Sequence, residues 1–231
     1  QGRPLVGKIL CWFQEQEAQA SQWQLLSHKD HLPHPPADPD EAEAQMFVKD
    51  HPNDTGQPIP RDQWRFARRG TAEQEPQPCH VFMESGFRPG RIYELVYTTR
   101  GSRILGLGFA AMRDMVSFLK YGSTSEGNPC AGALNRAHAF GQSQSGRFLR
   151  TYLYTGINTD EAGRQALDGL IPHVAGGMKG EFNLRFGQPS KDICYVLPGL
   201  FPCSDSLQID PLTGKGGSLL DSTHQKSHLP K

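Results

Sequence analysis

The run AHAFGQSQSGRFLR at residues 137–150 places the strongest constraint on the fold of this chain. An apolar stretch ends in a turn of the form Gly-x-Ser-x-small-Gly, and a helical pattern begins directly after it. The order strand, tight turn, helix is the setting of a nucleophile elbow, where a strained turn exposes a serine Oγ above a sheet. We therefore predict that Ser143 is a nucleophile and that the backbone N–H of Gln144 contributes to an oxyanion hole.

The residues around Ser143 have the sizes that such a turn requires. In an elbow the strand and helix backbones nearly touch, so the neighbours of the serine must be small. Gly141 and Gly146 meet this need, and Ser145 is the next smallest choice. The alternative interpretation is a Gly/Ser-rich connection without chemistry, because similar strings arise by chance. The strand pattern before the turn and the helix pattern after it favour the elbow.

The segments that flank the elbow predict an α/β fold. Residues 91–98 have the highest β-propensity in the chain, and apolar residues at helical spacing predict a helix over 105–120. A further strand with an exit loop is expected at 168–177, after a short helix at 161–167. Strands that alternate with helices predict a mostly parallel sheet with flanking helices.

The rest of the chain has a different character. Residues 178–231 carry no clear core pattern, which favours an irregular, lid-like insertion. The sequence thus predicts an N-terminal β/loop-rich region at 1–85, an α/β core at 86–177 and the insertion at 178–231. In the first region we expect short strands, including a possible edge strand at 46–48, among turns rich in Pro and Asx. The expected strands there cover residues 4–13, 46–48, 63–66 and 79–83.

Charge and motif content bear on the classes of partner. Lys plus Arg and Asp plus Glu both number 24, so no overall field attracts nucleic acid. No apolar run is long enough to form a transmembrane segment. Neither a Gly-Lys-Ser/Thr phosphate loop nor a dinucleotide fingerprint occurs, so we expect no cofactor. Four histidines in the Pro-rich segment raise the possibility of a metal site, but without acidic or Cys ligands at regular spacing we favour solvated loop residues; they are His28, His31, His34 and His51.

The five cysteines have no spacing typical of a zinc site. Cys194 and Cys203 flank one loop and could form a disulfide in an oxidising compartment. Reduced, scattered thiols explain the same pattern equally well, so the sequence leaves both the disulfide state and the compartment open.

Four stretches of the chain resemble a known family. They are FRPGRIYELVY at 87–97, GLGFAAMRD at 106–114, GQSQSGRFLR at 141–150 and DGLIPHVAGG at 168–177. Together they resemble the large bacterial alpha/beta hydrolase domain-containing proteins, whose elbow is of the Gly-x-Ser-x-Ser-Gly-Arg type. The elbow is also similar to the Gly-x-Ser-x-Gly-Gly-Arg form of tannase and feruloyl-esterase-like enzymes. The resemblance implies an α/β-hydrolase fold and hydrolysis of small-molecule carboxylic esters through an acyl-enzyme on Ser143.

The remaining members of a catalytic triad are harder to find in the sequence. In α/β-hydrolases the acid and the histidine follow the serine along the chain, each after a later strand. One strand is visible after Ser143, so we expect an incomplete portion of the fold, with the acid and the histidine beyond Lys231. A non-catalytic, binding-only protein is the alternative function.

Residues within the chain offer two weaker alternatives for the catalytic base. The first is a triad within the irregular segment, which has no strands to hold the side chains in place. The second is His173 at the end of a strand, for which a structural role is the favoured interpretation. Asp168, just before that strand, is expected to be a cap or turn residue. The candidates in the irregular segment are Asp205, Asp210, Asp221, His224 and His228.

Overall fold

The computed structural model describes residues 2–15, 19–27, 32–51, 54–177, 179–187, 201–202, 206–209 and 214–219. These residues belong to two compact units, one ending at Arg103 and one beginning at Ile104. The boundary that the sequence suggested at residues 85/86 lies inside a strand of the first unit. The candidate disulfide residues Cys194 and Cys203 and the internal triad candidates fall outside the described residues.

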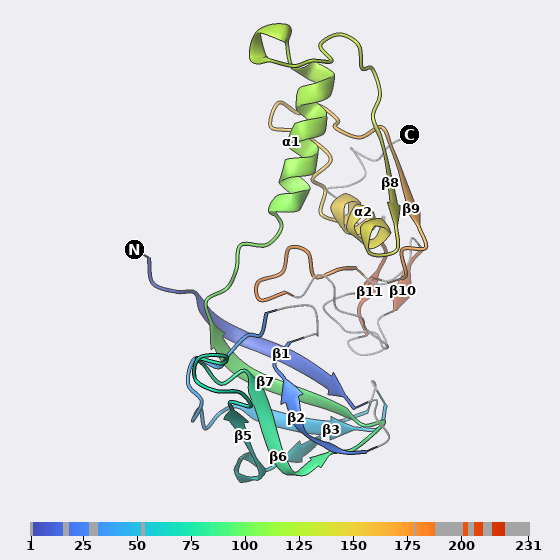
Figure 1. Cartoon of the computed structure of the whole chain (residues 1–231). Helices are drawn as coiled ribbons and strands as arrows, with labels where there is room; N and C mark the ends of the chain where they lie inside the picture. Colours follow the sequence, from blue (N-terminus) through green and yellow to red (C-terminus); the bar gives the residue numbers. More distant parts are fainter. Residues whose placement is uncertain are drawn as a thin grey trace. The chain divides into compact units, whose positions relative to one another are not determined.

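The first unit is formed by antiparallel strands (Figure 1). One sheet has the order β1-β7-β3-β4 and the other the order β2-β6-β5. A 3-10 turn, η1 (Arg61–Gln63), leads into the second sheet. The strands are β1 (Val6–Gln14), β2 (Ser21–Leu25), β3 (Gln45–Lys49), β4 (Gln57–Ile59), β5 (Trp64–Ala67), β6 (His80–Phe87) and β7 (Ile92–Arg100).

The two sheets of the first unit share one core. Alternate residues of a strand point to opposite faces, so one row of each strand is buried. β7 contributes Tyr93, Leu95 and Tyr97, and β6 contributes Val81 and Met83, all of which are almost fully buried. This is the packing of two sheets face to face.

The strand expected at 91–98 exists as β7, but its predicted parallel pairing is wrong. β7 pairs antiparallel with β1 along its whole length, from Val6↔Arg100 to Gln14↔Ile92, and antiparallel with β3 on its other side. The possible edge strand expected at 46–48 is part of β3. It lies between β7 and β4, so it is not at an edge of the sheet. The helix that follows β7 suggested a parallel crossover. The antiparallel pairing instead buries one face of β7, with Tyr93, Leu95 and Tyr97, against the second sheet.

The second unit contains the elbow segment. β8 and β9 pair in parallel, in a register that runs from His138↔Gly169 to Gln142↔His173. α2 connects them and contacts both strands, so β8-α2-β9 is a parallel crossover unit (Figure 1). Among the described residues β8 and β9 are the one pair of parallel strands, so the mostly parallel sheet is not confirmed. The elements are α1 (Leu107–Tyr121), η2 (Thr124–Glu126), β8 (His138–Gln142), α2 (Gln144–Tyr154), β9 (Gly169–His173), β10 (Gln208–Ile209) and β11 (Gly216–Gly217).

The helices of this unit agree with the sequence pattern. The helix expected at 105–120 is α1, and the pattern after Ser143 forms α2. Phe109 of α1 and Tyr152 of α2 pack with Leu167, all 2% exposed or less. No helix among the described residues is both long and apolar enough to cross a membrane.

The short helix expected at 161–167 does not form. Oδ1 of Asp160 accepts the backbone N–H groups of Ala162 and Arg164, at 3.0 and 2.8 Å. Such bonds between a side chain and nearby backbone compete with helical ones. Gly163, with φ of 78°, completes the turn. The segment is therefore a loop, tied to α1 by a hydrogen bond from the Ser117 hydroxyl to Oδ2 of Asp160.

Asp160 makes the stability of this unit dependent on pH. Burial alone would raise its pKa, but hydrogen bonds from Ser117 and Arg164 outweigh burial and lower the pKa from 3.8 to about 2. Because the folded pKa lies below the unfolded one, the stabilisation is complete above about pH 4 and is lost as the pH falls towards 2. We expect urea midpoints to fall over this range and Asp160→Asn to weaken that dependence. An equal dependence in both proteins would contradict the prediction.

Candidate active site

Ser143 occupies a backbone conformation that non-glycine residues seldom adopt. It lies between β8 and α2, with φ of 55° and ψ of −117°. A positive φ at a residue other than glycine costs free energy and persists where the surrounding structure enforces it. Ser143 is exposed, and although it stands at the N-cap position of α2, its side chain makes no capping hydrogen bond. Helix capping therefore does not account for a serine here.

Close approach of strand and helix explains the two glycines of the turn. A Cβ on Gly141 would lie 2.5 Å from the Ser145 carbonyl oxygen and 2.9 Å from the backbone nitrogen of Gly146. A Cβ on Gly146 would lie 2.8 Å from the Gly141 carbonyl oxygen. All these contacts are with backbone atoms, which a side-chain rotation cannot relieve. The requirement for small residues that the sequence predicted is confirmed at both positions.

Backbone hydrogen bonds hold Ser143 from two sides. Its N–H donates to the carbonyl of His173 at the end of β9, at 2.9 Å. Its own carbonyl accepts the N–H of Arg147, also at 2.9 Å, which begins the hydrogen bonding of α2. The turn is therefore fixed by the neighbouring strand and by its own helix, at the carboxyl ends of the parallel pair. Sites in α/β proteins are found at this end of the strands.

The loop that leaves β9 is held against α2. Arg150 Nη1 donates to the carbonyls of Gly176 and, at 3.2 Å, of Gly177. Arg147 Nε lies 3.4 Å from the Ala175 carbonyl, and Thr151 Oγ1 accepts the N–H of Gly180 at 3.1 Å. α2 thus sets the position of the loop that lies next to Ser143. The sequence pattern gave no indication of this role for the arginines.

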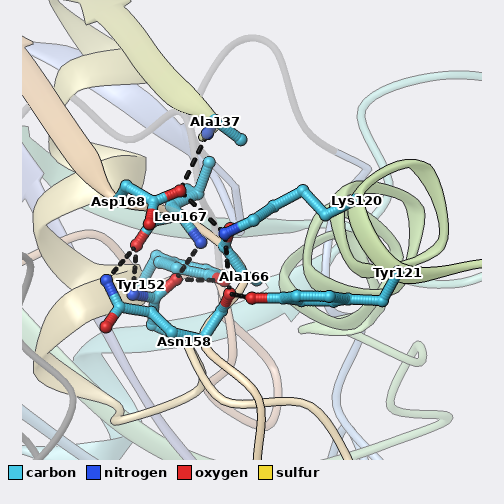
Figure 2. Close-up of polar contacts among 9 residues, drawn as sticks. Lys120, Tyr121, Ala137, Tyr152, Asn158, Ala166, Leu167 and Asp168 are labelled. Carbon is cyan, nitrogen blue, oxygen red and sulfur yellow. Dashed lines mark hydrogen bonds and ion pairs between the residues drawn. The ribbon is translucent and has the colours of Figure 1, made fainter. Parts of the chain in front are cut away.

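At the opposite end of the two strands a buried lysine forms a polar cluster (Figure 2). The Lys120 side chain is 2% exposed, and its Nζ donates to Asp168 Oδ2 at 2.7 Å. The same Nζ donates to the carbonyls of Gln165 and Ala166, at 3.0 and 2.9 Å. All three protons of the ammonium group therefore have acceptors. Burial alone would lower the pKa of Lys120, but the hydrogen bonds and charge interactions with Asp168 and Tyr121 together outweigh burial and raise the pKa above the ordinary value.

Asp168 links this lysine to the start of β8. Its Oδ2 accepts the N–H of Ala137 at 2.8 Å, and its N–H donates to the Ala137 carbonyl, also at 2.8 Å. Burial would raise the pKa of Asp168, but the bonds from Lys120 and Ala137 lower it below the usual value. The aspartate, expected to be a cap or turn residue, is an ion-pair partner that fixes the register in which β8 and β9 begin.

Asn158 extends the cluster to α2 (Figure 2). Its Oδ1 accepts the Tyr152 hydroxyl at 3.1 Å and the N–H of Leu167 at 2.9 Å, and its Nδ2 donates to the Leu167 carbonyl. Asn158 is 1% exposed, so each of these bonds satisfies a buried polar group. α1, α2 and the residues that precede β8 and β9 therefore meet in one polar network, which supports the turn at Ser143 from the far end of the two strands.

The structure gives His173 an aromatic neighbour. Its ring stacks on Phe140 with centroids 6.1 Å apart, while its backbone carbonyl holds Ser143. Nε of Arg113 pairs with Oδ1 of Asp114 in α1 at 2.7 Å, with the Arg113 side chain 15% and the Asp114 side chain 59% exposed. The described residues contain no group of three or more His, Cys, Asp or Glu that could hold a metal ion. The prediction of solvated histidines is wrong for His34, which is 7% exposed, whereas His51 is exposed and His28 and His31 fall outside the described residues.

A serine at positive φ between a parallel strand and a helix, with glycines at both close contacts, has the geometry that a nucleophile elbow requires. The family model described as "Alpha/beta hydrolase domain" matches residues 53–196, more than half of the chain. The chain belongs to this family. No curated protein and no solved structure matches the chain.

Proposed function

We propose that this protein is a serine hydrolase of carboxylic esters, with Ser143 as the nucleophile. The observation that carries the proposal is the backbone of Ser143, held at φ of 55° with its hydroxyl unused for helix capping. Strain of this kind collects at functional sites, where the surrounding structure enforces it. Membership of the alpha/beta hydrolase domain family supports a hydrolytic reaction.

The proposed reaction passes through one acyl-enzyme ester, which forms on Ser143 and is then hydrolysed. Ser143 Oγ attacks the ester carbonyl carbon while a base takes its proton, the alcohol leaves with a proton, and water then hydrolyses the acyl-enzyme. Gln144, the first residue of α2, would donate its N–H to the oxyanion. The positive end of the α2 dipole supports negative charge at this point.

A fluorophosphonate probe tests the proposal, because it forms a stable bond with an activated serine. We expect one label per chain, located by mass spectrometry on Ser143, in protein that includes the triad acid and histidine expected after Lys231. Ser145 is the internal control, because it lies in the same turn and is also exposed. A label on Ser145, or no label on folded protein, would refute the proposal, and no label would favour a binding-only protein.

A further inference from the structure

A second residue with unusual backbone geometry lies beside Ser143. Val174, the first residue after β9, has φ of 42°. For a β-branched side chain this region is a true outlier, because the side chain collides with its own backbone. The residue is also 63% exposed, so burial in a core does not explain the choice of valine. Glycine would adopt the same conformation without strain.

The register places Val174 next to the proposed nucleophile. Gln142 pairs with His173 in the parallel ladder, so Ser143 and Val174 are the next positions of the two chains. A Cβ on Gly146 would lie 2.9 Å from the His173 carbonyl oxygen and 3.1 Å from the Ala175 Cβ, so the first turn of α2 touches both neighbours of Val174. Ala175 is 7% exposed. The residues on either side of Val174 thus pack on the helix while the valine side chain remains open to solvent.

The surroundings enforce this conformation. Ser143 fixes the residue before Val174 through the His173 carbonyl, and Arg147 and Arg150 fix the carbonyls of the three residues after it. A strained residue persists where its flanks are held in this way. The arginines explain how the strain is maintained, but they do not explain why a valine rather than a glycine is present.

We propose that Val174 is a specificity-determining residue, whose exposed side chain forms an apolar wall against which the ester substrate lies. The inference rests on the proposed function of Ser143 and extends it to the substrate class, namely esters with an apolar group next to the reacting carbonyl. An apolar contact of this size discriminates between substrates that differ by a few methylene groups. The wall can contact either the acyl or the alcohol part, and separate substrate series distinguish them.

The test compares kcat/KM across two ester series. One series is p-nitrophenyl esters from acetate to hexanoate, and the other is acetate esters of alcohols from methanol to hexanol. We expect Val174→Gly to reduce the preference for long over short chains about tenfold in one series. Val174→Asn, a residue that tolerates positive φ, is expected to do the same. Met115→Ala, which removes another exposed apolar side chain in the same unit, is the control.

The melting temperature supplies an independent readout. At an ordinary position glycine is less stable than alanine, so we expect the reverse order here, with Val174→Gly melting a few degrees above Val174→Ala. Unchanged chain-length preference in both series, in variants that still label on Ser143, would overturn the inference and leave the proposed function intact. Absence of label and turnover in the unmodified protein would overturn both.

Discussion

Ser143→Ala is expected to lower ester turnover by a factor of about 10⁴ or more, because the acyl-enzyme can no longer form. The loss should appear in kcat and in kcat/KM together, as it does when the reacting atom itself is removed. Folding should be nearly unaffected, since the Ser143 side chain is exposed and makes no capping hydrogen bond. A change in the free energy of unfolding within about 0.5 kcal/mol is typical of such a site.

The matched variant is Ser145→Ala. Ser145 lies in the same turn and is also exposed, but it is the second residue of α2 and has ordinary helical geometry. We expect Ser145→Ala to retain turnover and labelling within about threefold of the parent protein, as for exposed residues away from the chemistry. Equal loss in both variants would mean that the turn as a whole, rather than the Ser143 hydroxyl, is required.

Lys120→Met is expected to destabilise the second unit by about 3–5 kcal/mol, which is typical when one partner of a buried ion pair is removed. Methionine fills a similar volume but donates no hydrogen bond. The carboxylate of Asp168 and the carbonyls of Gln165 and Ala166 would then lose the donor that the ammonium group provides. Urea unfolding monitored by circular dichroism measures the effect.

Arg136→Met is the control for this prediction. It removes a positive charge one residue from Ala137, at a side chain that is exposed, and should change the free energy of unfolding by less than about 0.5 kcal/mol. A combined Lys120→Met and Asp168→Asn variant should recover part of the loss, because no buried charge is then left unpaired. A destabilisation by Lys120→Met no larger than that of Arg136→Met would contradict the role given to the cluster.

Local patterns predicted the parts of the fold that depend on nearby residues. The helical spacing of apolar residues predicted α1, and the elbow motif predicted the order β8, turn, α2. The pairing of β7 could not be obtained in this way. Its partners, β1 and β3, are distant in sequence, and their choice depends on which arrangement buries Tyr93, Leu95 and Tyr97.

The expected helix at 161–167 was wrong for a related reason. Its composition suits a helix, but Asp160 binds the backbone N–H groups of Ala162 and Arg164 and is itself held by Ser117 of α1. A contact from outside the segment therefore decides between two local structures of similar free energy. The local sequence contains the aspartate, but Ser117, which holds it in place, belongs to α1 and lies 43 residues earlier in the chain.

The sequence alone determined the chemistry available at the turn: a serine at the tip, and glycines where the strand and helix backbones approach within contact distance. Those features are local, because a motif of a few residues specifies its own turn. Only the tertiary structure decided which residues hold the turn in place, since the His173 carbonyl and the strained Val174 lie at the end of β9, and the Lys120–Asp168 pair joins α1 to the far end of the two strands. Their positions depend on the pairing of β8 with β9 and the packing of α1 and α2, which no short stretch of sequence specifies.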